Sequence, residues 1–406
     1  PHHEYLQEVL LMLNSNYIQS LFGIKDGIIK NIENDDDGSI IHVHFEVRRD
    51  IHECPSCREL TDSIHDYRIQ KIKGPPLGEK FILFHYRKRR YVCSACGKRF
   101  YENNSFVPRY HRMSSSLVSY MLKELKSTNS RSSVAERCNV SVSTVSRVFD
   151  LISPDKPKLP EVLSIDEFKG NAETGKYQCI ITDPKSRRVL DILPGRETHH
   201  LTTYFFPFTK EERDKVKAVV IDMWKPYADV AQAYFKNAIV VVDRFHYVRQ
   251  VMWAFDKVRR EEQKKFSKER RRYFKKSKKL LWARFFNLSR ENQQAVEVML
   301  NLSPKLKEAY LLKEKFMEFV DALDFDDAKK KLKAWCLYVS VSNLPEFNYC
   351  FRTINRWQDN ILNSFKIPYT NAYTEGVNNK IKVLKRNAFG LRSFNRLRAR
   401  ILYMMD

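Results

Sequence analysis

Apolar runs separated by turn-forming residues give the clearest pattern, in the middle of the chain. They predict buried strands at 161–168, 177–182, 188–193, 216–222 and 238–243. Helix-like stretches, around 199–206 and up to residue 234, separate the last three runs. Because short turns join the first three runs, we expect an antiparallel meander there. The order strand, strand, strand, helix, strand, helix, strand is that of an RNase H-like mixed sheet.

A second pattern, of helical period, lies between residues 132 and 149. Two short apolar stripes occur there, Val134, Ala135 and Cys138, then Val142, Val145, Val148 and Phe149. Asn139 lies where the first helix should stop, and Ser141 or Ser143 can cap the second. This spacing predicts a helix-turn-helix, or, as a plainer alternative, a helical hairpin inside a core. In the first case the second helix would present Ser143, Thr144 and Arg147 to a major groove.

The patterns predict an α/β multidomain chain. We expect an N-terminal helix and hairpin (1–47), a zinc-ribbon-like cysteine module (48–105) and the helix-turn-helix (106–155). The first part of the mixed-sheet core (160–249), an all-helical insertion (250–365) and the second part of the core (366–406) follow. Residues 1–3 read as a trimmed or tagged start and are left out of the fold argument.

The charge narrows the choice of partner. The 406 residues hold 72 Lys and Arg against 49 Asp and Glu, a net charge of +23. Such an excess favours a polyanion, since each neutralised phosphate releases counterions. We therefore predict a nucleic acid as partner, with a ribosome-like or anionic-membrane role as the alternatives. A helix-turn-helix would make this partner double-stranded DNA. No apolar run is long enough for a membrane span, so no membrane partner is expected.

Four of the eight cysteines form two C-x-x-C pairs, Cys54 with Cys57 and Cys93 with Cys96. Four thiolates at this spacing predict a structural Zn²⁺ site, the usage of a cytosolic protein, with redox or incidental cysteines as the alternative. His52 and His85 are nearby substitutes without the knuckle spacing. The 35 residues between the pairs predict a hairpin with a basic, DNA-binding tip, Arg87, Lys88, Arg89 and Arg90.

Carboxylates follow the apolar strands at Asp166, Asp222 and Asp243. Acids at strand ends hold hard divalent cations, and two Mg²⁺ ions would suit phosphodiester chemistry, although a lone Asp there is more often a cap. Glu375 heads a helical segment, with Thr374 or Asn371 as its cap. Asn378 and Lys382 share the face of Glu375, which is otherwise an ordinary surface Glu. Basic residues that would contact DNA follow, Lys385 and Arg386.

Three motifs resemble the insertion-sequence transposases of the ISL-three family, part of the DDE class with an RNase H-like catalytic domain. They are Ser164-Ile-Asp166-Glu-Phe, Asp243-Arg-Phe-His246, and Glu375-Gly-Val-Asn-Asn-Lys-Ile-Lys with the Lys-Arg-Asn-Ala-Phe-Gly after it. The resemblance runs from the cysteine pairs almost to the C-terminus. It implies an enzyme that binds terminal inverted repeats and target DNA, cleaves DNA with two Mg²⁺ ions (Mn²⁺ substituting) and transfers strands.

The resemblance also ranks the acids. It implies that Asp166, Asp222 and Glu375 are the catalytic and Mg²⁺-binding residues. The pattern of strands alone does not decide between Asp222 and Asp243 as the second acid. Asp243 and His246 match an Asp-x-x-His signature after the second catalytic acid, which gives them an accessory role, as for Asn378 and Lys382. A homodimer in the bacterial cytoplasm, associated with the nucleoid, is implied as well.

Residues 257–284 hold fourteen Lys or Arg and three Glu. We expect this part of the insertion to contact phosphate, with a solvated basic face as the alternative. The tryptophans nearby are expected in its core rather than stacked on bases: Trp253, Trp282, Trp335 and Trp357. Two other functions remain open, a domesticated transposase acting as a DNA-binding regulator and a structure-selective RNase H-like nuclease.

Overall fold

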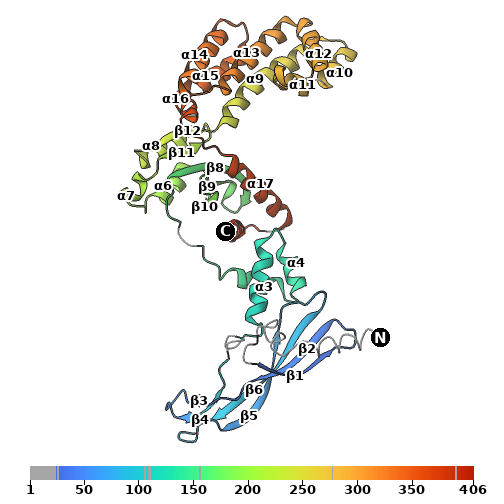
Figure 1. Ribbon diagram of the computed structural model, residues 1–406, viewed down its shortest axis with the longest axis vertical. Helices are drawn as coiled ribbons and strands as arrows, with labels where there is room; N and C mark the ends of the chain where they lie inside the picture. The colour runs from blue at the N-terminus through green and yellow to red at the C-terminus, as the bar shows by residue number, and fades with distance from the viewer. Residues whose placement is uncertain are drawn as a thin grey trace. The chain divides into compact units, whose positions relative to one another are not determined.

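The structure is a computed structural model that describes residues 24, 27–104, 107, 111–154, 157–276, 278–388 and 391–406. The chain divides into two compact units, residues 1–154 with 383–390, and residues 155–382 with 391–406 (Figure 1). The N-terminal helix expected within 1–47 lies outside the described residues.

A five-stranded sheet forms the core of the first unit. Its strands are β1 (Gly27–Asn34), β2 (Ile40–Val47), β5 (Ile64–Lys73), β6 (Phe81–Val92) and β7 (Arg99–Tyr101), in the order β1-β2-β6-β5 with β7 also on β6. Alternate residues such as Val43, Phe45 and Phe84 are buried on one face. Because β2 pairs with β6 in parallel, the expected boundary at residue 47 does not separate two folding units.

The predicted hairpin between the cysteine pairs is β5 with β6, but its basic run is not at the tip. Residues 87–90 lie within β6, so alternate side chains face opposite sides of the sheet. Arg89 is buried and forms ion pairs with Glu46 and Glu102. Its prediction as a DNA contact is therefore wrong, since contact with DNA would require a buried side chain to break both ion pairs.

The predicted helix-turn-helix is present as α4 (Arg131–Arg137) and α5 (Val142–Phe149), preceded by α3 (Ser115–Lys126), which the sequence reasoning missed. The turn places Asn139 at a φ of 47°, a left-handed conformation that Asn tolerates. Ser141, not Ser143, caps α5 by accepting from the Thr144 amide. Val142 was expected in the apolar stripe but is exposed.

The second unit contains the predicted mixed sheet. Its strands are β8 (Val162–Ala172), β9 (Gly175–Asp183), β10 (Arg188–Leu193), β11 (Ala218–Ile221) and β12 (Ile239–Val242), in the order β10-β9-β8-β11-β12. The first three pair antiparallel and the last two run parallel to β8. The predicted helices are α6 (Thr198–Phe205) and α8 (Lys225–Tyr234), with a short α7 (Lys210–Asp214) between them.

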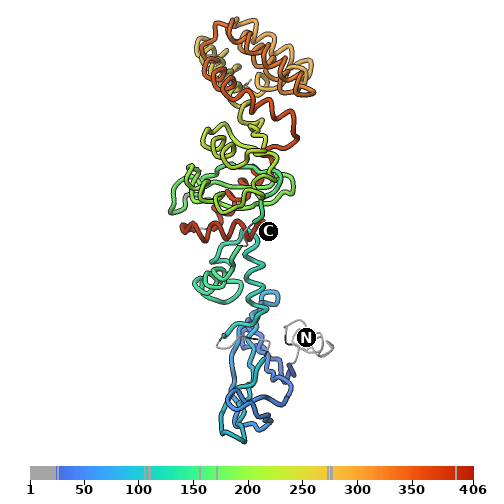
Figure 2. Tube along the Cα trace, turned by 90° about the vertical axis from the view of Figure 1, so that its left-hand side faces the viewer, coloured from blue at the N-terminus to red at the C-terminus, as the bar shows by residue number. Residues whose placement is uncertain are grey.

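Helices follow β12 without a further strand among the described residues. They are α9 (Arg244–Lys265), α10 (Lys268–Lys276), α11 (Lys278–Trp282), η1 (Phe285–Asn287), α12 (Arg290–Asn301), α13 (Pro304–Val320), α14 (Phe325–Val341), η2 (Pro345–Phe347), α15 (Asn348–Arg356), α16 (Gln358–Leu362) and η3 (Asn363–Phe365). They gather at one end of the sheet, and α17 (Ala372–Asn387) and α18 (Phe394–Met405) then return to it (Figures 1 and 2). One continuous apolar core runs from the sheet into these helices.

The helical segment settles the prediction for its tryptophans. Trp335 and Trp357 are buried, and Trp282 is half-buried with its indole N–H on Asp256. Trp253 is 53% exposed, so its expected place in the core is wrong. None of the described helices is long and apolar enough to span a bilayer.

The cap of α5 gives a direct test of the helix-turn-helix. We expect Ser141→Ala to destabilise this part of the protein by about 1 kcal/mol, because the Thr144 amide loses its acceptor. Ser143→Ala is the matched control, since Ser143 is an exposed serine in the first turn of the same helix, two residues from the cap. Thermal unfolding measures both, and equal melting temperatures for the two variants would contradict the assignment of the cap.

Candidate functional site

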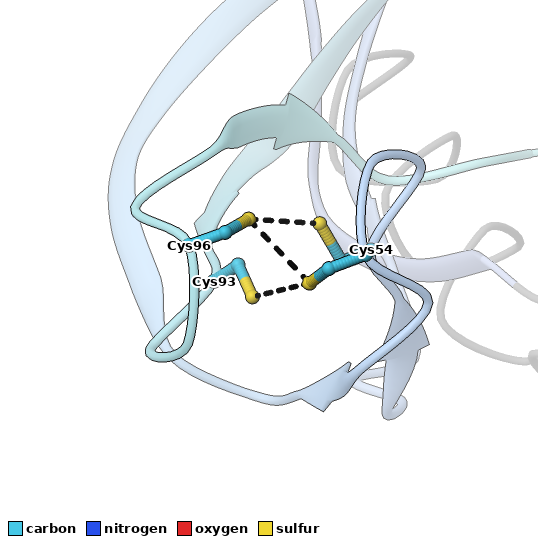
Figure 3. A group of neighbouring side chains, drawn as sticks. Cys54, Cys93 and Cys96 are labelled. Atoms are coloured by element: carbon cyan, nitrogen blue, oxygen red, sulfur yellow. Dashed lines mark hydrogen bonds between the residues drawn. The ribbon is translucent and has the colours of Figure 1, made fainter.

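The two cysteine pairs form matching turns that face each other (Figure 3). The Arg58 amide donates to the Cys54 carbonyl at 2.9 Å, and the Gly97 amide donates to the Cys93 carbonyl at 2.9 Å. Both residues have positive φ, 65° for Arg58 and 70° for Gly97. The predicted turn at Gly97 therefore has a counterpart at Arg58, where a side chain accepts the conformation that glycine adopts without strain.

The sulfur atoms of the four cysteines lie 3.5–3.6 Å apart where they are in contact. Four ligands at about 2.3 Å from a tetrahedral Zn²⁺ are separated by just under about 4 Å, so the donor set fits this ion. The backbone amides of Cys57 and Ser56 lower the pKa of Cys54 to about 6, which favours the thiolate that binds metal. The group is made of Cys54, Cys57, Cys93 and Cys96, without His52 or His85.

The strand register explains how distant acids meet in the second unit. Parallel pairing of β8 with β11 ends at Ile165 opposite Ile221, and β11 with β12 ends at Ile221 opposite Val242. The next residue on each strand is an aspartate, Asp166, Asp222 and Asp243 respectively. All three therefore lie at one edge of the parallel part of the sheet. Contrary to expectation, β8 does not end there, because its antiparallel pairing with β9 continues to Ala172.

Asp166, Glu167 and Asp222 form one carboxylate group, with ligand oxygens within 4.8 Å of one another. Burial and the charge of Asp222 raise the pKa of Asp166 to about 7. The ionised carboxylate is therefore electrostatically unfavourable unless a cation is bound beside it. Glu167 was not among the predicted residues, although it directly follows Asp166. Arg196 and Tyr227 hold its carboxylate at 2.9 and 3.1 Å.

Asp243, His246 and Glu375 form a second group within the same limit of 4.8 Å. The His246 Nε2 lies 2.7 Å from the Asp222 Oδ1, which joins the two groups. Burial lowers the pKa of His246, but the hydrogen bond and charge of Asp222 outweigh it and raise the pKa overall. Burial and the charge of Asp243 raise the pKa of Glu375. The carboxylates of Asp222, Asp243 and Glu375 thus lie around the imidazole of His246.

The carboxylate of Asp243 is engaged by backbone amides. Its Oδ2 accepts from the Phe245 amide at 3.1 Å, which caps α9, and its Oδ1 accepts from the Asn371 amide at 2.9 Å. Asp243 therefore joins the end of β12 to the segment that begins α17. These contacts give it a structural task that Asp222 does not have.

Helix α17 is fixed against the sheet by a buried polar network. The Ser164 hydroxyl donates to the Asn371 Oδ1 at 2.5 Å and contacts the Thr374 hydroxyl at 2.9 Å, which also contacts Thr182 at 2.8 Å. Because α17 begins at Ala372, Thr374 lies within the helix and is not its cap, which was one of the two expected caps. The network positions the next residue, Glu375, at the carboxylates.

Asn378 is brought to the first group as its spacing from Glu375 predicted. Its Nδ2 donates to the Asp166 Oδ2 at 2.9 Å, while its own Oδ1 is buried without a partner in the described structure.

The predicted basic residues of α17 lie away from the carboxylates or on its last turn. Lys382 is exposed and donates to Asn379, so the structure does not bring it to the carboxylates. Arg386, expected to contact DNA, is exposed on the last turn of α17, and Lys385 beside it is half-buried.

The donor set fits a hard divalent cation. Carboxylate and amide oxygens are the ligands that Mg²⁺ prefers, and a buried carbonyl oxygen without a donor is what such an ion would satisfy. The carboxylates of Asp166 and Asp222 repel each other, as the raised pKa of Asp166 indicates, and a cation would relieve that repulsion.

Comparison with known proteins agrees with this geometry. A family model described as a transposase, that of the ISL3 family, matches residues 163–401, more than half of the chain. The chain belongs to the ISL3 family of transposases. Residues 50–96 match the zinc-finger of transposases IS204, IS1001, IS1096 and IS1165, and residues 102–153 match the helix-turn-helix domain of this family. The transposase thus carries a zinc-finger, a DNA-binding helix-turn-helix and a DNA-cleaving, strand-transferring domain.

Two curated relatives are similar over long stretches. The transposase for insertion sequence element IS1001 of Bordetella parapertussis is 26% identical over 397 residues, 94% of this chain and 96% of the relative. The transposase for IS1557 of Mycobacterium tuberculosis is 24% identical over 297 residues, 65% of this chain and 66% of the relative. The first similarity covers both units of the transposase.

Removal of one ligand tests the zinc site. We expect the purified transposase to contain about one tightly held zinc ion per chain, and Cys57→Ser to lose it and lower the melting temperature. Cys336→Ser is the control, because Cys336 is half-buried in α14, outside the cysteine group. Metal analysis by mass spectrometry measures both variants. Full zinc content in Cys57→Ser would show that this group is not the site.

Proposed function

We propose that this chain is the transposase of a bacterial insertion sequence that binds terminal inverted repeats and catalyses two-metal-ion DNA cleavage and strand transfer. The observation that carries the proposal is a pair of adjoining acid groups, Asp166 with Glu167 and Asp222, and Asp243 with His246 and Glu375. The contact of His246 with Asp222 joins them. Asp166, Asp222 and Glu375 are the catalytic residues. The order of the strands and helices from β8 to β12 supports an RNase H-like core, and α9 to α16 an inserted helical domain.

Each acid has a distinct part in this proposal. Asp166, Asp222 and Glu375 would hold two Mg²⁺ ions, or Mn²⁺ in their place, and Asn378 would orient Asp166. When bound, the ions supply activation of an attacking water or 3′-hydroxyl oxygen and stabilisation of the leaving oxygen. His246 keeps Asp222 in position through its Nε2. The low exposure of Asp166, 7%, limits the access of bulk water to that carboxylate.

The contacts of the two competing aspartates support Asp222 as the second catalytic acid. Both oxygens of Asp243 already accept backbone amides, from Phe245 and Asn371. Asp222 faces a histidine side chain, which can move away without breaking a helix cap. Asp243 and His246 are accessory residues in this scheme, because Asp243 joins β12 to α9 and α17 and His246 contacts Asp222.

The DNA-binding part of the proposal rests on α5. Ser143 and Arg147 are exposed on the side of α5 opposite its buried Val145 and Val148, and Arg147 contacts the Thr144 hydroxyl at 3.3 Å. We propose that these three polar residues read the inverted repeat in a major groove. The exposed cations of α9 to α11 would contact phosphates of the same DNA. Because an element has two ends, we propose that a homodimer acts on them.

Excision of a marked element with its native ends tests the catalytic residues. We expect Asp166→Asn, Asp222→Asn and Glu375→Gln each to lower excision by at least about a thousandfold, because each removes a metal ligand, while binding to the ends persists. Asp243→Asn should retain partial excision and lower the melting temperature. Asp229→Asn, at an exposed pair with Lys225 in α8, is the matched control.

The pattern of loss discriminates among the alternatives. Loss with Asp243→Asn alone would move the second ligand there. Cleavage of branched DNA without joining of ends would indicate a structure-selective nuclease. Wild-type protein that binds ends without any excision would indicate a DNA-binding regulator.

Recognition by α5 is tested through Arg147. Arg147→Ala should weaken binding to inverted-repeat DNA by about tenfold or more, and bring it closer to the affinity for unrelated DNA, because a base contact is lost. Arg137→Ala is the control, since Arg137 is an exposed arginine of α4 that pairs with Glu124. Fluorescence anisotropy at fixed salt measures the affinities of the wild type and both variants for both DNAs. An equal loss of affinity for both DNAs would show that Arg147 contacts phosphate and does not read a base.

A further inference from the structure

Three side chains on one face of α9 stack on one another. Phe245, Arg249 and Trp253 are spaced by four residues, so they follow one another along the helix. The Arg249 guanidinium lies 5.3 Å from the centroid of the Phe245 ring and 4.8 Å from that of the Trp253 ring. We call this arrangement of ring, guanidinium and ring the α9 ladder.

Both rings of the α9 ladder are open to solvent. Phe245 and Trp253 are each 53% exposed, although α9 buries other aromatic residues, Tyr247 and Phe255, in the core. Large aromatic surface left in water on either side of a cation contributes little to folding. Such a surface is typical of a place where a flat ligand stacks.

The ladder begins at the candidate catalytic groups. The Arg249 Nη2 lies 3.1 Å from the His246 Nδ1. Because a guanidinium can only donate, the His246 Nδ1 accepts this bond and its Nε2, 2.7 Å from Asp222, carries the proton. Asp222, His246 and Arg249 are thus in one chain of contacts, and the ladder extends from there for about 12 Å along the helix.

Cations continue the same side of α9 beyond Trp253. Arg260 lies on the face of the ladder and Lys264 beside it, and both are exposed. Arg260 has Asp256 as an intrahelical partner at 3.2 Å. A strand of nucleic acid needs such a combination, aromatic faces for its bases and cations for its phosphates.

We propose that the α9 ladder binds unpaired nucleobases of the DNA strand whose phosphodiester reacts at Asp166, Asp222 and Glu375. A base would stack on Trp253 or Phe245, and Arg249 would face the adjoining phosphate. This assignment rests on the proposed function for its substrate, DNA opened near the reacting bond. It makes Trp253 and Phe245 substrate-positioning residues, separate from the residues that read the repeat in α5.

Equilibrium binding in Mg²⁺-free buffer tests the ladder without chemistry. The probe is a duplex with the ends of the element, carrying two unpaired nucleotides at the terminus, one of them 2-aminopurine. We expect the wild type to bind it about tenfold more tightly than the fully paired duplex and to quench its fluorescence by stacking. Trp253→Ala should lose the preference and the quenching, and Trp253→Phe should restore most of both.

Phe286→Ala is the matched control, an aromatic residue in η1 of the same helical segment that is 85% exposed. Melting temperatures establish that each variant is folded. Unchanged preference and quenching in Trp253→Ala would overturn the proposal. So would a change of oligomeric size in Trp253→Ala with normal quenching, because the rings would then contact a second copy of the chain.

The binding and excision experiments together separate a failure of the ladder from a failure of the catalytic assignment. Quenching that depends on Trp253, together with normal excision by Asp166→Asn, would support the ladder and refute the triad. Loss of excision in Asp166→Asn, together with quenching that does not depend on Trp253, would do the reverse.

Discussion

The buried hydrogen bonds between β8 and the start of α17 determine the geometry of the whole catalytic part. Ser164 and Asn371 are 207 residues apart, yet their side chains meet at 2.5 Å in a site without access to water. Each group would be left unsatisfied if α17 moved away, at a cost of about 1–3 kcal/mol per group. The helix therefore has one favourable position, and that position brings Glu375 and Asn378 to the edge of the parallel part of the sheet, where Asp166, Asp222 and Asp243 lie.

This fixed position of α17 brings several carboxylates together, and the groups around them offset only part of their mutual repulsion. Asp166 is nearly buried and its pKa is raised, which reflects the free energy of placing two carboxylates side by side. Asn378 donates to Asp166, backbone amides donate to Asp243, and the His246 Nε2 forms an ion-pair contact with Asp222. The Asn378 Oδ1 and the Asp222 Oδ1 are nevertheless buried without a hydrogen-bond partner among the described residues. A site in this condition is ready for cations, and their binding would both stabilise the fold and complete the reaction centre.

Patterns of period two and of turn residues predicted much of this architecture, because a half-buried sheet and a short helix must follow them. Apolar runs between turn residues predicted the five strands of the second unit, a helical period predicted α4 and α5, and the C-x-x-C spacing predicted the cysteine group. The burial and contacts of residues whose partners are distant in the sequence were not predicted. Arg89 pairs with Glu46 of β2 and with Glu102, which follows β7, and Glu167 is held by Arg196 and Tyr227. No local pattern contains those partners.

The first turns of α9 show how one short segment can serve several tasks. Asp243 caps the helix and holds Asn371, His246 faces Asp222, and Arg249 extends the contacts to two exposed rings. A helix enforces this order, because residues three and four apart must lie on neighbouring positions of its surface. A strand end could hold the acids but could not carry a continuous row of side chains away from them. The position of α9, directly after β12, therefore connects the chemistry at the sheet to the binding of the strand on which it acts.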